Sequence, residues 1–165
     1  MGSYSFAWVV CLWVVVPSIS WAESPCNTPP YAQRIVQEFD ADILRMTQDQ
    51  LAYDKSTEAD IRRTADHLQA IGKLTAPLRV REIERVVASG EFQSAGASKE
   101  TVLHLYDVSV RDAGRFRAAG NIAAACEAGI AAKTYLQLAR SFSVVQYQLL
   151  KSRLSEIEEV RPVSP

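Results

Sequence analysis

The sequence predicts an all-α protein, an antiparallel bundle of four or five helices that follows a cleaved N-terminal signal peptide. Two features of the chain predict the helices. Residues 31–76 and 78–161 contain no proline and are rich in Ala, Leu, Gln, Glu and Arg, which favour helix, whereas an interior proline costs about 3 kcal/mol. The chain also lacks Asn-Gly and Asp-Gly pairs and sustained apolar–polar alternation, the usual signals of β-hairpins.

The first two helices are expected over residues 31–53 and 56–74. Apolar residues recur every three or four positions in both segments, which is typical of a helix with one buried face. Thr57 followed by Asp60 resembles a capping box and predicts the start of the second helix. Leu44 and Leu51 fall on nearly the opposite side of the first helix from its apolar face, so they are candidates for contact with a partner.

A short third helix is expected to begin near Pro77 and to end before Gly90, with Val80, Ile83 and Val87 as its apolar face. Residues 91–99 are rich in Ser and Gly and predict a loop in which Ser98 caps the next helix. That helix covers residues 100–119, and Gly120 with Asn121 is the expected break. A last helix then runs from 122 to about 160, with a bend near residues 141–143.

The N-terminus has the features of an export signal. Residues 1–22 contain no Asp, Glu, Lys or Arg, and an apolar run over residues 6–16 ends at Pro17. This run is too short to span a bilayer, which needs about 20 residues, but it fits a signal peptide cleaved after Ala22. Residues 23–165 would then form one domain, periplasmic or secreted, without a transmembrane span. The alternative is a buried apolar segment of a cytosolic protein.

Cleavage would remove Cys11 and leave two cysteines, Cys26 and Cys126. An even number of cysteines in an exported protein predicts a disulfide. Two free thiols, or a bridge between molecules, are the alternatives.

The charge balance and the absence of motifs exclude several functions. The chain carries 18 Lys and Arg against 19 Asp and Glu, so binding of nucleic acid through bulk positive charge is not expected. Neither Cys-x-x-Cys-His nor Glu-x-x-His occurs, so the sequence predicts no cofactor and no metal site. Gly-x-Ser-x-Gly is also missing, and no catalytic residue is assigned.

His104, Arg111 and Arg115 form a candidate surface for an anionic ligand or a partner. Together with Asp107 they recur at three- and four-residue steps, opposite the apolar face of their helix. Arginine pairs bidentately with carboxylate or phosphate. The alternative is an exposed face crossed by salt bridges.

These observations favour an exported, non-enzymatic helical protein that binds another protein of the envelope or the extracellular space. The second candidate is a carrier of a small ligand or a metal, with its site between helices. A helical enzyme without a linear motif is the third.

Overall fold

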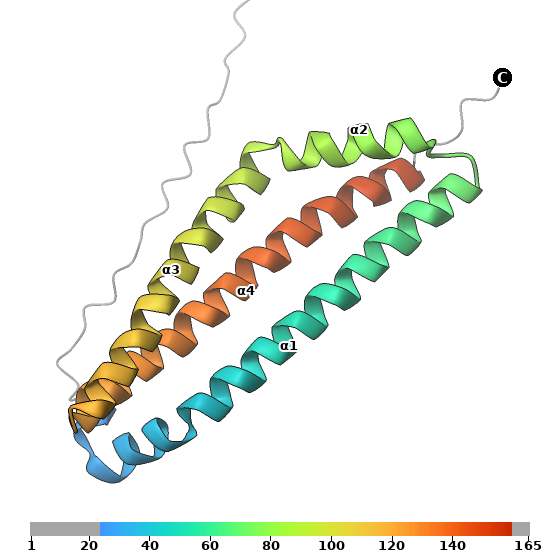
Figure 1. Ribbon diagram of the computed structural model, residues 1–165. Helices are drawn as coiled ribbons and strands as arrows, with labels where there is room; N and C mark the ends of the chain where they lie inside the picture. The colour runs from blue at the N-terminus through green and yellow to red at the C-terminus, as the bar shows by residue number, and fades with distance from the viewer. Residues whose placement is uncertain (1–23, 160–165) are drawn as a thin grey trace, which may run out of the picture.

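The computed structural model describes residues 24–159, and this part of the chain is helical, with four α-helices and no strand. The all-α prediction is therefore confirmed, whereas the predicted signal peptide, residues 1–22, lies outside the described residues. A short 3-10 turn, Pro25–Asn27, precedes the helices α1 (Pro29–Ala70), α2 (Ala76–Val87), α3 (Gly90–Ala118) and α4 (Ile122–Glu159) (Figure 1).

Helix α4 packs against both α1 and α3, while α2 crosses one end of the long helices (Figure 1). Helices α1 and α4 run in the same direction. Cys26 and Cys126 join their N-terminal ends, and the Lys73 ammonium donates to the Glu158 carbonyl near their C-terminal ends. The expectation of an antiparallel arrangement thus fits α3 against α4 but is wrong for α1 against α4, because α2 and α3 together form the returning segment.

The predicted break near residue 55 does not occur, because α1 continues for 42 residues. Glycine and proline, which interrupt helices most strongly, are absent between residues 31 and 71. Both halves of α1 also pack against other helices: Phe39 shares a core cluster with Ala132 of α4, and Leu68 shares another with Leu154 of α4. Thr57 therefore lies inside a helix and caps nothing.

The predicted loop over residues 91–99 is also wrong, because these residues form the first turns of α3. The cap is Ser89 and not Ser98, since the Ser89 Oγ accepts a hydrogen bond from the Phe92 amide at 3.3 Å. Tertiary contacts hold this segment: Ala95 is buried, and the Gln146 Nε2 donates to the Phe92 carbonyl at 3.3 Å. Packing against α4 thus outweighs the weak helix preference of Ser and Gly.

The predicted boundaries near Gly90 and Gly120 agree with the structure, whereas α1 ends at Ala70, four residues before the expected end at residue 74. Helix α2 ends at Val87, and α3 ends before Gly120, whose φ of +73° is the left-handed conformation that favours glycine. The Asn121 Oδ1 then accepts a hydrogen bond from the Ala124 amide at 3.1 Å, at the start of α4. The expected bend at residues 141–143 does not interrupt α4, which is helical throughout its 38 residues.

The core consists of three small clusters spaced along the long helices. Cys26, Ala32 and Cys126 form one end; Phe39, Ala113 and Ala132 form the middle; Ala65, Leu68, Leu74 and Leu154 form the end near α2. Many of these side chains are small, which lets the helices approach closely. Beside this core, a Cβ on Gly129 would lie 3.2 Å from the Phe39 ring.

The Sγ atoms of Cys26 and Cys126 lie 2.00 Å apart and their Cα atoms 5.7 Å apart. The predicted pairing is therefore present as a disulfide. Across residues 24–159, none of the helices is both long and apolar enough to cross a membrane.

Candidate functional site

The short helix α2 leaves much of its apolar face exposed to solvent. Val80, Ile83 and Val87 have the spacing predicted for one face, but 54%, 37% and 37% of their surfaces remain exposed. The side chain of α2 that is buried is Val86. The helix is therefore turned so that Val86 faces the interior, and the predicted apolar face is only partly covered.

Ile83 and Val86 line an open groove between α1, α2 and α4, here called the α2 groove, with a volume of about 240 Å³. Its apolar surface comes from all three helices: Ile61 and Ala65 of α1, Ile83 and Val86 of α2, and Leu150 and Leu154 of α4. Along α1 and α2 it extends over about two helical turns. At about 1.5 Å per residue this is a length of roughly 10 Å.

Charged side chains surround this apolar surface as ion pairs. The Arg79 Nη1 lies 2.6 Å from the Asp66 Oδ1 and connects α2 to α1. The Arg62 Nη2 lies 2.5 Å from the Glu58 Oε1 on α1 itself. The rim is thus close to neutral, because each of these cations has a carboxylate beside it.

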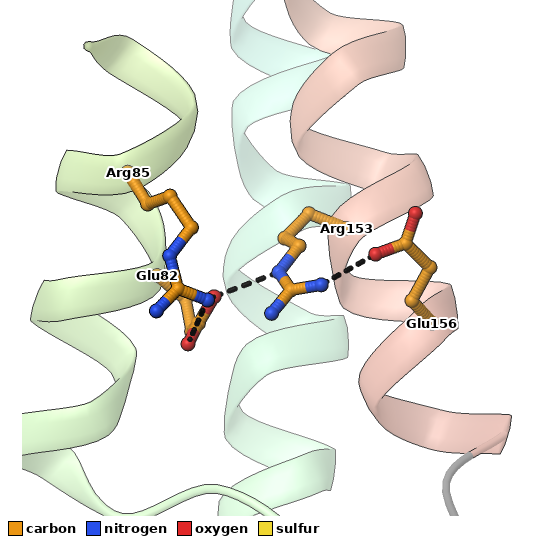
Figure 2. Close-up of polar contacts among 4 residues, drawn as sticks. All are labelled: Glu82, Arg85, Arg153 and Glu156. Atoms are coloured by element: carbon orange, nitrogen blue, oxygen red, sulfur yellow. Dashed lines mark hydrogen bonds and ion pairs between the residues drawn. The ribbon is translucent and has the colours of Figure 1, made fainter. Parts of the chain in front are cut away.

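The rim between α2 and α4 is a chain of alternating charges (Figure 2). The Glu82 Oε2 accepts hydrogen bonds from the Arg153 Nε at 2.7 Å and from the Arg85 Nη1 at 2.9 Å. The Arg153 Nη1 in turn donates to the Glu156 Oε2 at 2.5 Å. The hydrogen bond from Arg153 holds the pKa of Glu82 below its usual value, and bonds to Glu82 and Glu156 raise the pKa of Arg153.

The side chains of the α2 groove are suited to binding another molecule rather than to catalysis. The charged groups of the rim are paired, and the floor is hydrocarbon, so the α2 groove presents no nucleophile beside a base. Within the described residues there is no group of three His, Cys, Asp or Glu side chains that could hold a metal ion. An apolar surface with a polar rim is typical of a site for another protein's side chains.

Comparisons of the chain with protein-family models, with curated proteins and with solved structures found no match.

The structure places the predicted anionic-ligand residues on the exposed surface of α3. His104, Arg111 and Arg115 are all exposed. The Arg111 Nε donates to the Asp107 carbonyl one turn earlier at 3.2 Å. The Arg115 Nη2 lies 3.3 Å from the Asp112 Oδ1. The spacing argument is correct, since these residues share the outer side of α3, but their ligand role stays a prediction.

Leu44 and Leu51 are exposed on α1, with 60% and 54% of their surfaces accessible. This agrees with the sequence argument that they lie off the apolar face. Their role in partner contact stays a prediction.

The α2 groove was not predicted from the sequence. Its lining residues come from three helices that are distant in the chain, so no linear motif joins them. One signal was present: α2 has apolar residues both at 80, 83 and 87 and at 86, which is more apolar surface than one neighbouring helix covers.

Proposed function

We propose that this chain is an exported, non-enzymatic helical protein that binds another protein through the α2 groove. The observation that carries the proposal is the half-exposed apolar face formed by Val80, Ile83 and Val87 beside an apolar groove. Contiguous apolar surface rimmed by polar groups is costly in water, and in soluble proteins it marks interaction sites.

The dimensions of the α2 groove favour an amphipathic helix as the partner segment. A length of about two turns accepts two apolar side chains spaced three or four residues apart, as in other helix-in-groove complexes. The near-neutral rim, with Arg79–Asp66 and Glu82–Arg153 already paired, favours a partner whose flanking charges are also balanced.

Export is supported by the uncharged apolar segment of residues 1–22 and by the Cys26–Cys126 disulfide, because disulfides persist in oxidising compartments. The mass of the intact protein, measured with and without reductant, tests both features at once. Cleavage after Ala22 and a gain of two hydrogen atoms on reduction of the disulfide to two thiols are expected. Full-length material purified from the cytosol, with Cys26 and Cys126 as free thiols, would contradict export.

Site-specific photo-crosslinking in the native envelope fraction tests the binding site. A photoreactive residue at Ile83 is expected to capture one defined protein, whereas the same residue at Arg81, an exposed position of the same helix, is expected to capture none. Equal capture at both positions, or no capture at Ile83, would contradict the proposal.

Substitutions provide the quantitative test once that protein is purified. Val80→Ser and Ile83→Ser are each expected to weaken binding by about tenfold, because each removes one apolar side chain that the partner would bury. Leu105→Ser is the matched control, because Leu105 is 38% exposed, close to the 37% of Ile83, but lies on α3. Equal losses for Ile83→Ser and Leu105→Ser would show that the α2 groove is not the site.

A further inference from the structure

A second pocket lies between α1, α3 and α4, with a volume of about 280 Å³. We call it the α3 pocket, and it shares none of its lining residues with the α2 groove. Leu103, Leu136 and Ala139 form its apolar wall, and Gln50, Lys99 and Arg140 are among its polar groups.

Two cations line the α3 pocket, Lys99 of α3 and Arg140 of α4. Neither has an ion pair with a carboxylate among residues 24–159. The Arg140 guanidinium lies 5.2 Å from the centre of the Tyr53 ring, a cation–π contact that holds the side chain in place. The pocket also contains one carboxylate, Asp54, so it keeps one positive charge in excess.

The α3 pocket also contains a polar atom without a partner. The Gln50 Nε2 donates to the Asp54 Oδ1 at 2.7 Å, which directs the other end of the amide away from that carboxylate. The Gln50 Oε1 is buried and accepts no hydrogen bond from the described residues. Because a buried carbonyl without a donor is unfavourable, a small movement of the Gln50 side chain that lets this oxygen accept from a ligand N–H or O–H would be stabilised.

The phenol of Tyr106 completes the polar side of the α3 pocket. Burial, together with the nearby charge of Asp107, raises the pKa of Tyr106. A phenol is protonated at neutral pH even without this rise, so the hydroxyl can donate a hydrogen bond to an anion.

We propose that the α3 pocket binds a small organic anion that combines an apolar body with an N–H or O–H donor. The anionic group faces Lys99 and Arg140, the donor bonds to the Gln50 Oε1, and the apolar body lies against Leu103 and Leu136. Inorganic phosphate would satisfy the cations but leave the apolar wall uncovered. This site is independent of the α2 groove and favours the small-ligand carrier that the sequence offers as its second candidate.

Two fluorescent probes that differ in one group test the proposal on the disulfide-bonded protein. Anilinonaphthalene sulfonate carries an anion, an N–H and apolar rings, and N-phenylnaphthylamine lacks only the sulfonate. Lys99→Gln and Arg140→Gln are each expected to weaken binding of the sulfonate about threefold to tenfold. Binding of the neutral probe, which also reports that the variants are folded, is expected to stay within about twofold.

The Gln50→Leu variant gives a different expected pattern. It removes the unpaired acceptor, so it weakens both probes, since both carry the N–H, and circular dichroism checks that the fold is kept after loss of the bond from Gln50 to Asp54. Arg81→Gln, which removes an exposed cation of α2 outside both the α2 groove and the α3 pocket, is the control that changes neither probe. Unchanged sulfonate binding in the Lys99 and Arg140 variants, or an equal loss in Arg81→Gln, would overturn the proposal.

Displacement of the bound sulfonate tests the ligand class. Indoleacetate has a carboxylate, an N–H and an apolar ring, and it is expected to displace the probe at least about tenfold more strongly than its methyl ester. Equal displacement by the ester would show that the anion is not recognised and would overturn the proposal.

Discussion

Glu82 is the residue on which the charges at the rim of the α2 groove converge. Its side chain is only 13% exposed and accepts hydrogen bonds from Arg85 on its own helix and from Arg153 on α4 (Figure 2). The bond to Arg153 connects the short α2 to the long α4. A single carboxylate therefore helps to position the helix that carries the exposed apolar face.

Glu82→Gln is expected to lower the free energy of unfolding by about 0.5–1 kcal/mol at pH 7, because the ion pair is partly exposed to water. Its effect on pH dependence is more specific. The pKa of Glu82 is lowered from the usual 4.5 by the bond to Arg153, so its stabilisation is complete above that value and is lost as the pH falls through the folded-state pKa. Urea unfolding at pH 7 and pH 3 should show a smaller acid loss in the variant.

Glu84→Gln is the matched control for that measurement, since Glu84 is exposed on the same helix. It is expected to leave the difference between the two pH values as in the unmodified protein. An acid loss in Glu82→Gln equal to that of the control would show that the carboxylate does not couple α2 to α4.

The residues of both candidate sites show what a sequence can and cannot predict at this scale. Cys26 and Cys126 were predictable as a pair because only two cysteines follow residue 22. Lys99, Gln50 and Arg140 were not, because each comes from a different helix and looks like an ordinary surface residue. Their meeting depends on the relative rotation of three helices, which local spacing does not determine.

At the scale of the helices, the cap that the structure shows, Ser89, contrasts with Thr57, which the sequence pattern singles out as a cap. The Ser89 Oγ accepts from the Phe92 amide and begins α3, whereas Thr57 lies in the interior of α1. The pattern Thr-x-x-Asp is thus insufficient to start a helix when the preceding residues are already helical. A continuous apolar face that packs on α4 outweighs the cap, because most helical stability in proteins comes from packing.

Alanine substitutions at these two positions should have opposite effects. Ser89→Ala is expected to cost about 1 kcal/mol through loss of the cap, and Thr57→Ala is expected to cost nothing or to gain up to about 0.5 kcal/mol from the better helix preference of Ala. Thermal or urea unfolding followed by circular dichroism measures both. A loss of about 1 kcal/mol in Thr57→Ala would indicate that α1 is broken at the predicted cap.

Helix α4 approaches α1 at Gly129, and this contact can be tested against a second glycine. A Cβ on Gly129 would lie 3.2 Å from the Phe39 Cδ2, whereas one on Gly114 of α3 would meet nothing within 4 Å. Gly114→Ala should therefore stabilise the protein by about 0.5–1 kcal/mol through helix preference. Gly129→Ala should instead destabilise it by about 1 kcal/mol, because crowding the buried ring exceeds that gain.

The comparison of the two glycine variants is decisive because the chemical change is identical. Equal stabilisation by both substitutions, measured by urea unfolding, would show that α4 does not pack as closely on α1 as the structure describes. A repacked Phe39→Leu background should recover part of the loss in Gly129→Ala.

Most of the helices could be predicted from the sequence, but the direction in which each long helix runs relative to its neighbours could not. Proline positions and apolar spacing locate α2 and α4 within a few residues, because these signals act locally. The parallel course of α1 and α4 depends on the absence of a turn in the middle of α1. That absence follows from contacts at both ends of the helix, at Phe39 and at Leu68, which lie far apart in the chain.

At the scale of the whole molecule, one covalent bond joins the start of the described chain to α4. The bond spans a sequence separation of 100 residues, and Cys26 and Cys126 are 2% and 0% exposed. Closing such a long segment restricts the unfolded chain strongly. The disulfide also holds the 3-10 turn of residues 25–27 against the core cluster around Ala32.

Removal of the disulfide in a Cys26→Ser, Cys126→Ser variant is expected to destabilise the protein by about 2–5 kcal/mol. Urea unfolding of the variant and of the oxidised protein measures the difference. The reduced unmodified protein is the control and should unfold close to the variant. Equal midpoints for the oxidised and reduced proteins would contradict a stabilising bond.

The position of the disulfide has a mechanical consequence. It lies at one end of helices that are roughly 60 Å long, at about 1.5 Å per residue, while the far end, where α2 crosses, is closed by non-covalent contacts such as Lys73 with the Glu158 carbonyl (Figure 1). Because the covalent constraint is confined to one end, a given tilt between α1 and α4 would change their spacing more at the α2 end than beside the disulfide.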